Sequence, residues 1–217
     1  MGGVAFSLGL ILVVIAGAEL FTGNNLIVMA MASNKITLGK MLSGWVIVYL
    51  GNFLGAVLTA AIVLLARQHE QGNGSVGLNA IKIAASKCEL DFFQAFALGV
   101  LCNALVCLAI WLCLSARSVT DKVLAIVFPI SAFVAAGLEH CVANMYFIPY
   151  GLLLKSSASS QFWESNQANA DQFSALTWSN FALMNLLPVS IGNIVGGAFM
   201  VGLVYWYVHR YGNDESE

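Results

Sequence analysis

Five long apolar runs dominate this chain and limit what it can fold into. They cover residues 2–33, 41–66, 92–115, 122–154 and 181–208. Each run reaches the ~20 residues that a helix needs to cross a hydrocarbon core of about 30 Å. Of the 217 residues, 59% are hydrophobic and only 9% are charged, whereas about a quarter of a soluble domain is charged. The sequence predicts an all-α membrane protein with one transmembrane domain over residues 1–217.

Charge and cysteine usage exclude several functions. The net charge is -2 and no cluster of lysine and arginine occurs, so we expect no nucleic-acid partner. Three of the five cysteines lie in one apolar run without a metal-ligand spacing, which is typical of small buried side chains. His140 beside Cys141 and Glu139 is too sparse for a metal centre or a nucleophile with its base. We therefore expect no metal, no cofactor and no enzymatic activity.

Two of the runs are too long to be straight rods. Residues 2–33 and 122–154 would each extend about 48 Å as helices, at ~1.5 Å per residue. Polar residues and glycine interrupt both runs near the middle, at 19–24 and at 139–144. We predict two broken transmembrane helices.

The interruptions belong to an internal repeat. The motif GxExxxxN begins at Gly17 and again at Gly137, and the motif GNxxG begins at Gly51 and again at Gly192. The run 92–115 stands between the two copies. If it opens the second copy, each copy has three spans, and an odd number of spans inverts one copy relative to the other. The sequence therefore predicts an inverted repeat with binding near the membrane midplane. By the same logic, the first transmembrane helix of the complete pattern is missing from this chain.

The distribution of cations predicts the orientation. Five of them lie in short connections or at the chain end: Lys35, Lys40, Arg117, Lys122 and Arg210. The remaining four border the two long connections. Because the positive-inside rule applies best to short loops, we expect those loops and the carboxyl terminus in the cytoplasm.

Polar residues at membrane depth are costly and indicate function. Nearly all of them lie in the repeated motifs: Glu19, Thr22, Asn24, Glu139, His140, Asn144, Asn52 and Asn193. Unwound backbone is tolerated in a bilayer only against protein or a water-filled path, so the two breaks are expected to face each other across a pore. The half-helices after each break would direct their amino-terminal ends at the midplane, which favours an anion.

The two glutamates and the histidine have competing interpretations. Glu19 and Glu139 are structural if they accept hydrogen bonds from backbone N–H groups at each helix break, and functional if they relay protons. His140 corresponds to Leu20 in the other copy. It is either a satisfied buried residue or, as we favour here, a group that offers a proton or a positive charge to a passing anion. Thr22 can donate or accept a hydrogen bond across the pore.

An apolar stripe accompanies these polar groups. Phe6 and Leu10 are spaced four residues apart and share a helix face, and Phe133 precedes His140 by seven residues, about two helical turns. Such a stripe is either core packing or a constriction of the pore. The GNxxG pairs are expected to be packing sites, where glycine lets helices approach closely.

Six motifs together resemble one known family. They are GxxFSLGLIL, GAELFTGN, GNFLGA, ARSVTDK, GLEHCVANM and PVSIGNIVGG. In this combination they look like the formate/nitrite transporter family, and the likeness extends over nearly the whole chain. The resemblance implies an aquaporin-like fold of six spans with broken second and fifth helices. It also implies a homopentamer with one pore per subunit, in contact with membrane lipids in a bacterial inner membrane.

The resemblance also assigns roles to residues. It implies that His140 is the central pore histidine and that Thr22 is its partner in a loop with Leu20 and Phe21. The apolar constrictions correspond to Phe6, Leu10 and Phe133. Polar positions that line the route or support the histidine correspond to Lys87, Asn103, Asn144 and Asn193.

The function implied is a membrane channel or transporter for formate and related small monovalent anions, with or without a proton. Nitrite or hydrosulfide channels of the same family remain alternatives. A facilitator of neutral small solutes is a further alternative, because aquaporin-like folds also conduct water and glycerol.

Overall fold

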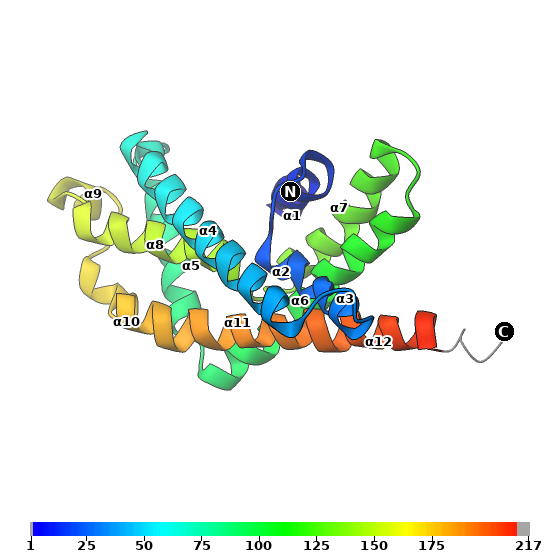
Figure 1. The fold of residues 1–217 in the computed structure, drawn as a ribbon. Coiled ribbons are helices and arrows are strands. Elements are labelled where there is room, and N and C mark those ends of the chain that lie inside the picture. The colour runs from blue at the N-terminus through cyan, green and yellow to red at the C-terminus, as the bar shows by residue number, and fades with distance from the viewer. Residues whose placement is uncertain (1, 212–217) are drawn as a thin grey trace. The chain divides into compact units, whose positions relative to one another are not determined.

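The computed structural model describes the backbone of residues 2–211 and the side chains of residues 2–209. Its elements run along the chain as shown in Figure 1. They are α1 (Gly2–Ala16), α2 (Phe21–Asn24), η1 (Asn25–Ile27), α3 (Val28–Ala32), α4 (Leu38–Leu65), η2 (Gln68–Glu70), α5 (Ser75–Cys88), α6 (Phe92–Ser115), α7 (Val119–Ala135), α8 (Cys141–Ser157), α9 (Ser160–Ser165), η3 (Ala170–Phe173), α10 (Trp178–Asn180), η4 (Phe181–Leu186), α11 (Leu187–Ile194), η5 (Val195–Leu203), α12 (Val204–Trp206) and η6 (Tyr207–Tyr211). Within the described residues every regular element is a helix.

Both long apolar runs are broken. The first stops at Ala16 and resumes at Phe21, with a bend of 56° between its two parts. The second stops at Ala135 and resumes at Cys141. The unwound residues lie a few positions before those expected at 19–24 and 139–144. The reason is local: Gly17 and Gly137 adopt positive φ, at 78° and 64°, which ends the helix before each glutamate.

The number of spans differs from the five apolar runs. Three stretches in the described part of the chain are long and apolar enough to cross a membrane: Leu38–Leu65, Phe92–Ser115 and one within Ala170–His209. A fourth is the bent pair Gly2–Ala16 and Phe21–Ala32. The remaining run is divided into α7 and α8, each of 17 residues, which is at the lower limit for a crossing.

The described residues form two compact units. The first contains residues 2–50, 96–140 and 189–211, and the second contains Gly51–Ala95 and Cys141–Pro188. That residues 1–217 act as one channel domain stays a prediction.

In the first unit, α1 packs against α7. The elements α11, η5, α12 and η6 follow one another without a break and form the last helix, against which α6 packs. A Cβ added to Gly3 would lie 2.7 Å from the Cα of Ser131. A Cβ at Gly196 would lie 2.0 Å from the carbonyl oxygen of Val100, so only glycine permits this backbone contact. The buried core between α1, α6 and α7 includes Leu10, Cys102, Val106, Ile126, Ile130 and Phe133.

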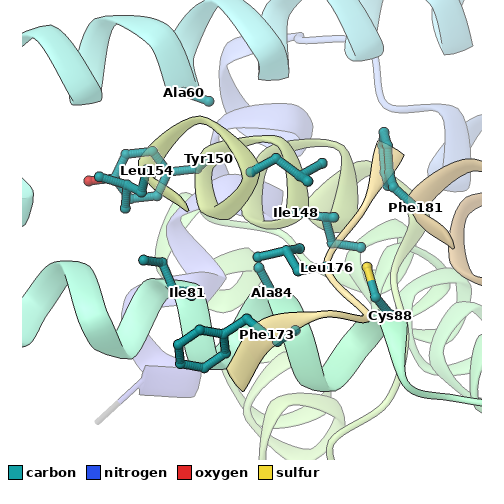
Figure 2. Close-up of a cluster of buried hydrophobic side chains, with 12 residues drawn as sticks. Ala60, Ile81, Ala84, Cys88, Ile148, Tyr150, Leu154, Phe173, Leu176 and Phe181 are labelled. Atoms are coloured by element: carbon teal, nitrogen blue, oxygen red, sulfur yellow. The ribbon is translucent and has the colours of Figure 1, made fainter. Parts of the chain in front are cut away.

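In the second unit, α5 packs against α8, and the chain after α9 covers them. Figure 2 shows the core, in which Leu176 lies beside Ala84, and Phe173, Phe181 and Cys88 belong to the same buried cluster. The Lys155 ammonium donates to the carbonyls of Phe173 and Leu176 at 2.7 and 3.2 Å. These bonds satisfy the backbone of the connection before α10.

The surface of α4 is apolar. Of its most hydrophobic segment only 6% is buried, and Ile47, Leu54 and Ile62 are 67%, 61% and 64% exposed. An apolar surface of this extent is stable against lipid or another protein surface rather than water.

Candidate functional site

The candidate site of the first unit centres on His140. Its ring is 6% exposed, and its Nε2 lies 2.9 Å from the hydroxyl oxygen of Thr22, which is fully buried. The histidine is the last unwound residue before α8, and the threonine lies in the first turn of α2. The two broken runs therefore meet through side chains at the point where each helix resumes.

This hydrogen bond can exist in either direction. A hydroxyl is both donor and acceptor, so Thr22 can donate to a neutral ring or accept from a ring protonated at Nε2. The pair remains bonded in both protonation states.

Apolar side chains cover one side of the histidine. The ring of Phe133 stacks on that of His140, with centroids 6.1 Å apart and planes inclined by 24°. Phe6 meets Phe133 edge to face at 5.3 Å. Leu10 is 5% exposed and belongs to the same cluster. The structure thus brings the three predicted apolar residues together.

Asn103 holds the loop that carries Thr22. Its amide nitrogen lies 3.2 Å from the Thr22 carbonyl, 2.9 Å from Asn25 Oδ1 and 2.7 Å from the Asn193 carbonyl. The thiol of Cys107 also approaches the Thr22 carbonyl, at 3.5 Å. Because these polar groups are buried and bonded together, the backbone position of Thr22 is fixed on one side.

Asn193 holds the backbone on the other side of the site. Its amide nitrogen donates to the Gly99 carbonyl at 2.8 Å and to the Glu139 carbonyl at 3.0 Å. The second bond fixes the residue directly before His140. Asn193 is fully buried, and the flanking glycines of its GNxxG motif let α6 come close enough for this contact.

The two glutamates have different surroundings. Glu139 is 3% exposed. Glu19 is exposed, and its Oε2 accepts a hydrogen bond from Asn24 at 2.6 Å. The predicted caps on backbone N–H groups, and the alternative proton relay, both stay predictions.

The loop residues beside Thr22 face two environments. Phe21 is 4% exposed and packs edge to face on Tyr49 at 4.8 Å and on Trp45 at 6.3 Å. Leu20 is partly buried and packs against the core between α1, α6 and α7. Trp45 also donates from its indole N–H to the Asn24 carbonyl at 2.9 Å, which ties α4 to the end of α2.

Two of the predicted residues belong to the second unit. Asn144 donates to Asn185 Oδ1 at 2.8 Å, and Asn185 donates to the Lys87 carbonyl at 2.9 Å. Asn144 and Asn185 are fully buried. This chain of amides joins α8, η4 and the end of α5. The Lys87 backbone rather than its ammonium makes this contact.

Sequence reasoning missed Asn25 and Asn185, which are both fully buried. Asn25 accepts from Asn103 and donates to the Phe21 carbonyl at 3.2 Å. A signal was present, because an amide inside an apolar run requires a partner. Neither residue has an equivalent in the repeated motifs, so the repeat did not reveal them. No group of three or more histidine, cysteine or acidic side chains in the described residues can hold a metal ion.

Comparison with known proteins identifies the family. The model of the formate/nitrite transporter family matches residues 1–207. The chain is 45% identical over 214 residues to the formate channel FocA of Escherichia coli (strain K12), covering 99% of this chain and 75% of that protein. It is 42% identical to FocA of Haemophilus influenzae, covering 97% and 74%.

Solved structures agree with this result. One described as a pentameric formate channel with formate bound has a TM-score of 0.90 and 48% identity, over 96% of this chain and 82% of that one. An ion channel of the same family has a TM-score of 0.76 and 33% identity, over 95% and 75%. The chain belongs to the formate/nitrite transporter family and is an integral membrane protein, and this family comprises channels and transporters rather than enzymes.

Proposed function

We propose that this chain is the subunit of a homopentameric channel for formate and related small monovalent anions, with His140 as its pore histidine. The observation that supports this best is the buried contact of 2.9 Å between His140 and Thr22, at the meeting point of the two broken runs. Relatives at 45% and 42% identity are formate channels. The matching pentameric channel was solved with formate bound.

Selectivity follows from the surroundings of the histidine. Phe6, Leu10 and Phe133 form an apolar cluster beside it, and apolar constrictions disfavour hydrated ions. A histidine side chain can donate a hydrogen bond or a proton to an anion beside it. Anion entry and protonation of His140 are therefore coupled, and the anion leaves alone or as the neutral acid.

The finer architecture belongs to the same proposal. The repeated motifs support an aquaporin-like inverted repeat in one channel domain. We place the channel in a bacterial inner membrane, and the positive-inside rule supports a carboxyl terminus in the cytoplasm. Lys87 and Asn144 are proposed to line the path of the anion through the channel or to support the residues that line it.

Transport by variants of the histidine tests the proposal. His140→Asn keeps hydrogen bonding but cannot titrate near neutral pH, so formate flux into proteoliposomes should lose its pH dependence. His140→Phe should also lower the rate or change selectivity, measured with formate, nitrite and hydrosulfide in parallel. If both variants keep the parent's pH profile and selectivity, His140 is structural and the proposal is wrong.

Thr22→Val provides a second test, because valine keeps the shape of threonine but removes the hydroxyl. We expect altered formate flux with the oligomer intact by native mass measurement. Unchanged flux and pH response would reduce Thr22 to a packing residue. Glycerol uptake without anion current in planar bilayers would favour the neutral-solute facilitator instead.

A further inference from the structure

A surface pocket of about 440 Å³ lies in the first unit, away from His140, where the end of α3 meets the last helix. Its polar lining comes from Ser33, Lys35 and His209, and its apolar lining comes from Met29 and Ala30. Tyr205 and Trp206 complete the wall. Among the side chains of residues 2–209, none that lines the pocket is acidic. The pocket thus combines cationic and hydroxyl groups with an apolar floor.

Backbone hydrogen bonds form the rim at the end of α3. Asn34 adopts a left-handed conformation, with φ at 55°. This turn lets the Lys35 N–H donate to the Ala30 carbonyl and the Asn34 N–H to the Met31 carbonyl, both at 2.9 Å. The Ser33 N–H donates to the Met29 carbonyl at 3.0 Å. These bonds satisfy the last carbonyls of the helix and reduce their repulsion of an anion.

Aromatic contacts hold the opposite wall in place. His209 stacks on Trp111 with centroids 5.6 Å apart, and Tyr205 meets Trp111 edge to face at 4.9 Å. The indole N–H of Trp206 donates to Ser33 Oγ at 2.9 Å, which ties the two walls together. Because Ser33 Oγ accepts that bond, its own O–H can donate to a ligand. Tyrosine and tryptophan gather in this way where hydrocarbon meets the headgroup region.

Lys35 is the principal charge of the pocket. It is exposed, and no carboxylate among the side chains of residues 2–209 forms an ion pair with it. Lys40, only five positions further on, is also exposed but lies outside the pocket. Replacing each lysine in turn therefore distinguishes binding in the pocket from general attraction to surface charge.

We propose that this pocket binds the phosphodiester headgroup of a membrane phospholipid. The Lys35 ammonium and the Ser33 hydroxyl contact the phosphate, with His209 beside them. Met29, Ala30 and the aromatic rings contact the glycerol and the first methylenes. A lipid is favoured over free phosphate because Val204, Tyr207 and Val208 on the same helix are 50%, 61% and 58% exposed and require hydrocarbon nearby. The proposal depends on the membrane location but not on formate transport.

Lipid binding to the full chain in detergent tests this site by native mass measurement. The probes are phosphatidylglycerol and an uncharged galactosyl diacylglycerol with the same acyl chains. We expect Lys35→Gln to weaken phosphatidylglycerol binding about fivefold, the effect of one cation near an anionic headgroup. Lys40→Gln should leave it unchanged. Binding of the galactolipid should be equal in all three proteins.

Three results would overturn the proposal. The first is equal affinity of phosphatidylglycerol for the parent and for Lys35→Gln. The second is full displacement of that lipid by millimolar glycerol 3-phosphate, which would make the pocket a site for free anions. The third is a changed oligomeric state of Lys35→Gln with normal lipid affinity, which would indicate that a second copy of the chain covers this face.

Discussion

The two copies of the GxExxxxN motif bend the chain alike but place different side chains at corresponding positions. Gly17 and Gly137 both adopt positive φ and end a helix. Glu19 then lies exposed, whereas Glu139 is 3% exposed. The next residue is Leu20 in the first copy and His140 in the second. The repeat therefore specifies the backbone break, whereas His140 and Thr22 each occupy a position that is apolar in the other copy, Leu20 and Val142.

The two GNxxG motifs also differ in how closely other parts of the chain approach them. Gly192 and Gly196 lie so close to α6 that an added Cβ would come within 2.3 and 2.0 Å of backbone oxygens. A Cβ added to Gly51 or Gly55 would meet no atom outside its own helix within 4 Å. The motif that begins at Gly192 therefore packs against α6, whereas space is left beside the glycines of its copy on α4.

Gly196→Ala should be the most damaging change, because its methyl group would overlap the Val100 carbonyl. Overpacking of this kind costs about 1–3 kcal/mol or more. Gly55→Ala is the matched control, and it should be neutral or stabilising by up to ~1 kcal/mol through better helix propensity. Thermal unfolding of the detergent-solubilised proteins, followed by circular dichroism, measures both. Equal midpoints would show that the two motifs are equivalent after all.

Asn193→Leu should be nearly as harmful, because it leaves the Gly99 and Glu139 carbonyls buried without this donor. An unsatisfied buried group costs about 1–3 kcal/mol. Formate flux should fall as well, since the backbone before His140 loses its support. Ser190→Ala is the control on the same helix, as it removes a single hydrogen bond of 2.8 Å to Tyr49. If both variants unfold at the same temperature, Asn193 does not position the second break.

Glu139→Gln should destabilise the protein more than Glu19→Gln. At the buried position, an amide NH₂ replaces an acceptor oxygen and requires a new partner, at a cost of about 1 kcal/mol or more. At the exposed position the same change should stay within ~0.5 kcal/mol. Unfolding midpoints of the two variants, measured side by side, decide this. A larger effect at Glu19 would contradict the conclusion that the two breaks place their glutamates in different surroundings.

The smallest effect is expected where the second broken run begins. Ser118 and Asp121 form a capping box at the start of α7, with the Asp121 N–H donating to Ser118 Oγ at 3.1 Å. The hydrogen bond with the Ser118 side chain, followed by those from the backbone N–H groups of Ser118 and Arg117, lowers the pKa of Asp121 below its ordinary value of 3.8. Its contribution to stability is therefore complete above the ordinary value and is lost as the pH falls through the lowered one.

Asp121→Asn should accordingly lower the unfolding midpoint slightly at pH 6, and the difference from the parent should shrink at a pH below the lowered pKa. Thermal melts at the two pH values provide the measurement. Asp171→Asn is the control, because it removes one negative charge outside the capping box of α7 and so measures the general effect of charge on the melts. A difference that grows on acidification would have the wrong sign for this cap.

Much of the fold was readable from the sequence because its signals are local. Continuous apolar runs predict membrane helices, and the GxExxxxN motif with its glycine predicted both breaks, which the structure confirms within a few residues. The motifs GAELFTGN and GLEHCVANM predicted the family, which the comparisons confirm. The expectation that GNxxG serves packing is confirmed at Gly192 and Gly196.

Only the tertiary structure decided which partners the buried polar groups find. Asn103 and Asn25 are 78 positions apart yet bond to each other, and Asn185 bonds to both Asn144 and the Lys87 carbonyl. No local pattern encodes such pairs, because an amide in an apolar run demands a partner without specifying which one. The same reason explains why identical motifs expose Glu19 and bury Glu139: burial depends on the elements that pack around a residue, and these differ between the two copies.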